Sequence, residues 1–247
     1  MQPTIGWRSV SIALVGLAVT LLSAFPARGQ DSSGIDLQWG VSAGVASSSF
    51  QGDAGALAST GMRGDERLPA HFAGRRTGAT VGIHLGAALT SRIGVQTGLR
   101  YVQTGGVVDR RRFGPADGLE NETARYQLGI VSMPILGTYE FGSRTSPLRP
   151  TLVVGAAGQR LLRSTVQSTV TSQRRAPYRL NSTPESVRPM GVTMIVGGDL
   201  AYTLAKGRDV ILKGRYSYGV TDLVDGPEGT HVRMGSFTVG IQYALPL

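Results

Sequence analysis

Seven ionisable side chains recur at alternate positions of regularly patterned segments, and side chains of these types could pair with one another, move protons or guide ions. The positions between them are apolar, so each segment has one polar and one apolar side. Because an unpaired buried charge costs several kcal/mol, we expect the three cations to pair with the three carboxylates in a structural network that leaves no ion pathway. The seven are Asp36, His84, Arg100, Glu140, Asp199, Lys213 and Arg215.

A histidine next to a serine could serve as the base of a hydrolase, and some small β-barrels act on lipid A. None of the three histidines, His71, His84 and His231, stands two residues from a serine on one strand face. That spacing would aim base and nucleophile at the same ester. We therefore predict no catalytic residue, with a lipid A-modifying enzyme as an open alternative. Three scattered histidines without any cysteine also predict neither a metal site nor a cofactor.

Eight segments carry these side chains, each with the period-two alternation of a β-strand that has one apolar face. The fifth is apolar on both faces, so its orientation stays open. The 35 glycines of the chain disfavour a helical domain, because glycine weakens helices. The segments are Ile35–Ala46, Ala79–Leu89, Ile93–Tyr101, Tyr126–Phe141, Thr151–Leu161, Val192–Leu204, Val210–Val220 and Ser236–Tyr243.

Alternation alone fits two folds: a secreted soluble β-sandwich, which buries its apolar faces, and a membrane barrel, which turns them to lipid. The connections favour the barrel, because short links alternate with long ones, as in outer-membrane barrels with short periplasmic turns. We predict an all-β protein, an eight-stranded antiparallel up-and-down transmembrane β-barrel. The short links are 90–92, 142–150 and 205–208, and the long ones are 47–76, 105–125, 163–188 and 222–230.

Outward aromatic residues fall near the segment ends, where membrane barrels carry girdles at the two interfaces. The interior of an eight-stranded barrel is just wide enough for side chains to fill, so we predict a plugged lumen. A narrow channel for small solutes is the alternative. The predicted girdles comprise Tyr139, Phe141, Tyr202 and Tyr243 on the periplasmic side, and Tyr101, Tyr216, Tyr218 and Phe237 on the external side.

Residues 1–29 have the composition of a cleaved signal peptide. A basic start precedes the apolar run Val10–Phe25, and Pro26 ends this run before the small residues that suit cleavage after Gly29. The run is shorter than the roughly 20 residues that span a bilayer. We expect residues 30–247 to form one barrel domain in the bacterial cell outer membrane.

Three short motifs follow one another along the predicted strands. VSMPILGTYEF begins at Val131, LRPTLVVGAAG begins at Leu148, and an Arg-Tyr-x-Tyr-Gly strand begins at Arg215. In type, order and spacing they resemble the small outer-membrane β-barrel domain proteins of the porin family, also called PorT-like. The resemblance spans essentially all of the chain after residue 29. It implies an outer-membrane barrel that the barrel assembly machinery inserts, and it names no substrate.

Two basic runs, Asp109–Phe113 and Ser172–Arg175, lie in predicted external loops. Clustered guanidinium groups suit the phosphates of lipopolysaccharide, although a solvated loop tip explains them equally well. We therefore predict a monomeric, non-enzymatic protein with a structural, adhesive or interaction role through its external loops. Its expected partners are outer-membrane lipid and lipopolysaccharide. Nucleic acid is not expected, because an exported chain does not meet it in the cytoplasm.

Overall fold

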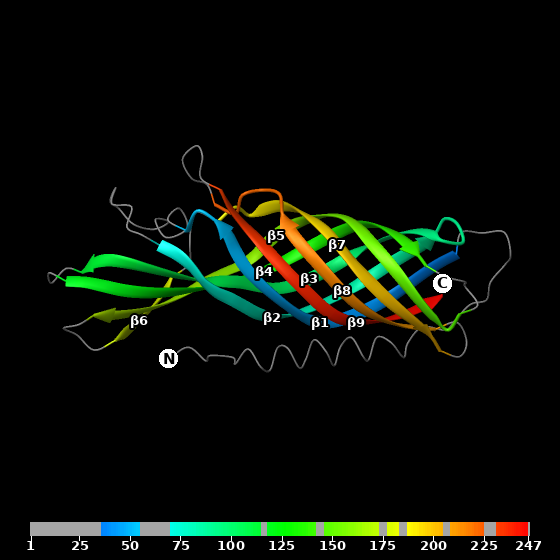
Figure 1. Cartoon of the computed structure of the whole chain (residues 1–247), viewed down its shortest axis with the longest axis horizontal. Helices are drawn as coiled ribbons and strands as arrows, with labels where there is room; N and C mark the ends of the chain where they lie inside the picture. Colours follow the sequence, from blue (N-terminus) through cyan, green and yellow to red (C-terminus); the bar gives the residue numbers. More distant parts are fainter. Residues whose placement is uncertain are drawn as a thin grey trace.

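In the part of the chain that the structure, a computed structural model, describes, there are nine antiparallel β-strands (Figure 1). The predicted signal peptide lies outside the described residues and stays a prediction. Within the described ranges, no helix is long and apolar enough to cross a membrane. The strands are β1 (Asp36–Gly52), β2 (Ala70–Ala88), β3 (Ile93–Gly114), β4 (Gly118–Glu140), β5 (Leu148–Ser172), β6 (Tyr178–Ser182), β7 (Met190–Thr203), β8 (Asp209–Gly219) and β9 (Val232–Pro246). The structure describes residues 36–54, 70–114, 118–141, 146–172, 177–182, 187–204, 208–224 and 231–246.

Eight of these strands close into a ring in the order β1, β2, β3, β4, β5, β7, β8, β9, and β9 pairs with β1 to complete it. Each strand pairs with its neighbour along the chain, except that β7 follows β5 in the ring because β6 pairs only with β5. The prediction of an eight-stranded antiparallel up-and-down barrel is confirmed. A closed ring leaves no strand edge whose backbone groups would lack partners in lipid.

The ring turns its apolar side chains outward. Ile83 on β2 is 57% exposed, whereas its neighbour His84 is 4% exposed. The structure also settles the orientation of the fifth predicted segment, because Val153 and Ala157 are buried inside while Leu152 and Val154 are exposed outside. The apolar exterior is what a surface facing lipid requires.

Strands β3, β4 and β5 continue beyond the ring and, with β6, form a sheet that projects from one end of the molecule (Figure 1). The predicted loop boundaries are therefore wrong. Residues 105–114 and 118–125 belong to β3 and β4, and residues 163–172 and 178–182 belong to β5 and β6. The first predicted loop, 47–76, likewise contains the end of β1 and the start of β2.

Where these strands leave the ring, the apolar residues lie on the opposite face of the strand, which explains why the predicted loop boundaries are wrong. Along β4, Tyr126 and Leu128 are buried on the inner face, whereas Met133 and Ile135 are exposed on the outer face. The apolar residues thus move from the outer face to the inner face within one continuous strand. A search for outward apolar residues detects only the part that faces lipid.

The seam between β1 and β9 depends on a close approach of two backbones. Gly44 lies opposite Gly240 in the register, and a Cβ atom on Gly44 would stand 2.3 Å from the carbonyl oxygen of Val239. At Gly86, an inward glycine away from the seam, the nearest atom to an added Cβ would be 3.9 Å away. The strand pairing that closes the ring therefore tolerates no side chain at Gly44.

We predict that Gly44→Ala lowers the free energy of unfolding by about 1–3 kcal/mol, because an inserted methyl group forces the two strands apart. The measurement is urea unfolding of the refolded protein in detergent micelles, with heat-modifiable gel migration as a second readout. Gly86→Ala is the matched control and should unfold at the wild-type midpoint. Equal midpoints for the two variants would contradict the steric account of the seam.

Candidate functional site in the barrel interior

The barrel interior has three layers along its axis. At the end with the short turns lies a polar vestibule of about 180 Å³. Charged side chains fill the middle, and an apolar cluster that includes Phe50, Tyr126 and Leu128 fills the part toward the projecting sheet. Two cavities of about 20 Å³ each have room for roughly one water molecule. One lies within the charged layer, and the other lies between this layer and the cluster.

The strongest contact of the middle layer is the ion pair between Arg215 on β8 and Asp199 on β7. Arg215 Nε donates to Asp199 Oδ1 at 3.2 Å, and Nη2 donates to Oδ2 at 2.5 Å. Nη2 also donates to Gln96 Oε1 at 2.9 Å, and Gln96 Nε2 donates to Gln242 Oε1 at 3.3 Å. The bidentate geometry is the one that guanidinium and carboxylate groups favour. These contacts connect β7 and β8 to β3 and β9 through the lumen.

A second cluster lies beside the vestibule around Arg149, which the sequence analysis did not include among the lumen residues. Its Nη2 donates to Asp209 Oδ2 at 2.5 Å, and its Nη1 lies 3.5 Å from Glu140 Oε2. Thr203 Oγ1 donates to Asp209 Oδ1 at 2.8 Å. Arg149 was missed because it precedes the one segment whose inward face the apolar pattern left undefined.

The predicted pairing is wrong for Lys213 and Arg100. Lys213 stands directly opposite Asp199 in the β7–β8 register, yet both oxygens of that carboxylate are taken by Arg215. The Nζ atom of Lys213 is buried and has no hydrogen-bond partner among the described residues. Arg100 donates from Nε to Ser132 Oγ at 3.3 Å. The planar guanidinium fork of Arg215 fits a carboxylate better than an ammonium group does. The side chain of Asp36 lies outside the described residues.

His84 contacts a serine that the search along single strands could not find. Ser42 Oγ on β1 lies 2.6 Å from His84 Nε2 on β2, across the strand boundary. The other ring nitrogen, Nδ1, is buried without a hydrogen-bond partner in the described part of the chain. A catalytic histidine is normally oriented by a third group, and none contacts this ring nitrogen. The neighbouring cavity, about 20 Å³, is too small for a lipid ester.

The other two histidines lie on the exposed surface and not in the lumen. His71 Nε2 is 3.9 Å from Asp109 Oδ2, and the His71 side chain is 74% exposed. His231 Nδ1 lies 2.9 Å from Asp222 Oδ2, and this hydrogen bond is the largest of the influences that lower the pKa of Asp222. Within the described ranges, no three side chains of the types that bind metal ions cluster together.

The model of the outer membrane protein beta-barrel domain family matches residues 28–225. The chain belongs to this family. It is therefore a β-barrel of the bacterial outer membrane. Strand β9 lies beyond the matched residues, yet it pairs with both β1 and β8 and closes the ring. No curated protein matches the sequence.

Solved structures of small outer-membrane proteins are similar to this barrel. Neisserial surface protein A has 15% identity and a TM-score of 0.39, and the alignment covers 83% of this chain and 95% of that one. The outer membrane protein OprG from Pseudomonas aeruginosa has 14% identity, a TM-score of 0.36 and coverages of 89% and 99%. The outer membrane protease OmpT from Escherichia coli has 11% identity, a TM-score of 0.38 and coverages of 88% and 99%. Likenesses this weak carry no functional inference.

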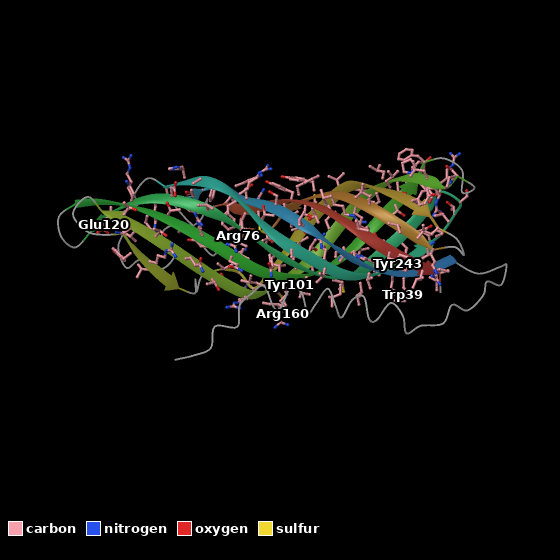
Figure 2. All side chains as sticks on the ribbon, turned by 90° about the horizontal axis from the view of Figure 1, so that it is seen from below. Trp39, Arg76, Tyr101, Glu120, Arg160 and Tyr243 are labelled. Atoms are coloured by element: carbon pink, nitrogen blue, oxygen red, sulfur yellow. The ribbon has the colours of Figure 1, made fainter. Side chains whose placement is uncertain are left out.

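The structure places three of the aromatic residues predicted for the girdles of this outer-membrane barrel. Near the short turns, the rings of Tyr139 and Phe141 meet edge to face with centroids 5.0 Å apart. Tyr101 lies well away from the end of β3, midway along the molecule, with Glu120 toward one end and Trp39 toward the other (Figure 2). The expectation that Tyr101 marks a strand end is therefore wrong. It stands where the outward apolar residues of β3 end, and the girdle itself stays a prediction.

We predict that Asp199→Ala destabilises the barrel by about 3–5 kcal/mol, because it leaves the buried Arg215 guanidinium without its counter-ion. The measurement is the urea midpoint in detergent micelles. Asp109→Ala is the control, since its contact with His71 is long and exposed, and it should change stability by less than about 1 kcal/mol. Similar losses for both variants would mean that the interior pair does not stabilise the fold.

Proposed function

We propose that this protein is a non-enzymatic, non-conducting outer-membrane barrel that acts as an interaction protein through its projecting sheet. The observation that carries the proposal is strand length. Strands β3, β4 and β5 have 22, 23 and 25 residues, whereas a membrane-spanning strand needs about 9–11. The excess length forms a hydrogen-bonded sheet beyond the lipid-facing ring, which gives the protein an ordered surface for partners.

The filled interior supports a barrel that does not conduct. A conducting pore needs a continuous aqueous path, and the apolar cluster lies between the charged layer and the projecting sheet. Within it, the ring of Phe50 contacts that of Tyr126 edge to face, with centroids 5.5 Å apart. The enclosed Ser42–His84 pair, whose Nδ1 has no orienting group among the described residues, supports a non-enzymatic role.

The charge on the outside of the projecting sheet favours polyanionic partners, among which we propose the phosphates of lipopolysaccharide. Arg111, Arg125 and Arg160 are exposed on β3, β4 and β5. Glu122 on β4 is buried and pairs with Arg110 at 2.8 Å. Basic side chains therefore face solvent while a carboxylate of the same sheet points inward. Arg160 lies in the same row of the sheet as Tyr101, at the edge of the outward apolar surface (Figure 2).

Planar-bilayer recording tests the absence of conduction. We expect no discrete conductance steps from the refolded wild-type protein, because side chains fill the lumen. Steps of uniform size that scale with the amount of inserted protein would support the channel alternative. The variant Phe50→Ala, which removes a ring from the apolar cluster, shows whether this cluster prevents conduction through the lumen.

Lipopolysaccharide binding tests the proposed partner. We expect the double variant Arg125→Gln/Arg160→Gln to bind lipopolysaccharide roughly five- to thirtyfold more weakly, since each exposed charge contact contributes about 0.5–1 kcal/mol. Isothermal titration in detergent micelles measures the affinity. The charge-matched control is Arg92→Gln/Arg208→Gln, whose exposed residues lie at the end with the short turns. Equal affinities of the two double variants would reject this surface as the binding site.

The lipid A profile of cells that overproduce the protein tests the alternative of a lipid A-modifying enzyme. We expect cells that overproduce the protein to keep an unchanged lipid A profile by mass spectrometry, because the histidine of the Ser42–His84 pair has no orienting group. A modified lipid A species that disappears with His84→Ala would replace the present proposal with an enzymatic one.

A further inference from the structure

The middle layer of the lumen holds more basic than acidic side chains. Lys213, Arg100 and Arg215 are each at least nine-tenths buried there, with Asp199 as the carboxylate among them. The next carboxylates toward the vestibule, Glu140 and Asp209, both contact Arg149. Among the described residues, the ion pair of Arg215 therefore leaves Lys213 and Arg100 without a carboxylate partner.

Lys213 is the cation with the least compensation. Its side chain is 6% exposed, and its Nζ atom makes no hydrogen bond within the described residues. An ammonium group in such a position loses its hydration and forms no hydrogen bond in return, which costs several kcal/mol. A lysine in this position stays charged only where something outside the protein chain compensates the charge.

A cavity of about 20 Å³ lies beside this group. Lys213, Arg100 and Arg215 line it together with His84 and with the hydroxyl-bearing residues Ser42 and Thr238. A volume of this size holds one particle about as large as a water molecule. Cationic and hydroxyl groups around one small space are suited to an anion, and no carboxylate lines the cavity.

We propose that this cavity binds a small monovalent inorganic anion of the halide type, with chloride as the natural probe. The anion accepts hydrogen bonds from Lys213 Nζ and from the Arg100 guanidinium, and it neutralises part of the excess charge. A phosphate or carboxylate ligand is excluded by volume. His84 lines both this cavity and the vestibule, so the proposed ion site lies next to the space at the end with the short turns. The site does not depend on the role proposed for the projecting sheet.

Chloride-dependent stability tests the site. The refolded protein in detergent micelles is unfolded with urea in mixtures of sodium chloride and sodium gluconate at constant ionic strength. Binding to the folded state alone raises stability with the logarithm of ligand concentration above the dissociation constant. We expect the wild-type midpoint to rise with chloride and Lys213→Met to lose this dependence. Arg111→Met removes one exposed cation with the same change of charge and should keep it.

Bromide gives a direct readout that does not rely on the variant folding. Crystals of the wild-type protein soaked in sodium bromide should show an anomalous peak in contact with Lys213 Nζ. The proposal is overturned if the wild-type midpoint ignores chloride, if Lys213→Met responds as the wild type does, or if no bromide lies in this cavity. The first and last of these results would mean that the cavity holds water beside an uncharged lysine.

Discussion

The structure depends on one constraint: a backbone N–H or C=O group in lipid must find its partner within the protein. Closure of the ring through β1 and β9 meets this requirement, and the close approach at Gly44 allows it. Everything else follows from the ring. Its exterior must be apolar, so apolar and polar residues must alternate along each strand. Its narrow interior must contain the polar side chains that the exterior cannot accept.

The polar side chains inside the ring make a specific set of contacts with one another. A lumen of eight strands is filled by its own side chains, so each inward charge competes for few partners. Arg215 occupies Asp199 with two hydrogen bonds, and Arg149 occupies Glu140 and Asp209. The Nζ atom of Lys213 has no hydrogen-bond partner among the described residues, although Lys213 stands opposite Asp199 in the β7–β8 register. The result is a polar interior whose carboxylates pair with Arg149 at the vestibule end and in which basic side chains outnumber acidic ones in the middle.

Beyond the ring, the same strands obey the opposite rule. In the half of β4 near the short turns, Met133, Ile135 and Tyr139 face outward, although Leu136 faces inward. From Ile130 toward the strand start, the apolar side chains that the structure describes face inward. This change within one strand is what a membrane boundary requires, because water replaces lipid there as the medium around the strand. It also separates two parts of the molecule, since the ring carries the apolar exterior while the projecting sheet carries the surface for which we propose a partner.

The sequence by itself determined the strand faces, the number of ring strands and the outward position of the apolar residues, because a strand in lipid carries this information in every second residue. It also placed His84, Arg100 and Lys213 in the lumen. Only the tertiary structure decided which side chains meet, as Ser42 with His84 and Arg149 with Asp209 do. These contacts depend on the register between strands, and no pattern within a single strand encodes it. The projecting sheet was hidden for a related reason: its apolar residues face inward, where the search for a lipid-facing pattern does not find them.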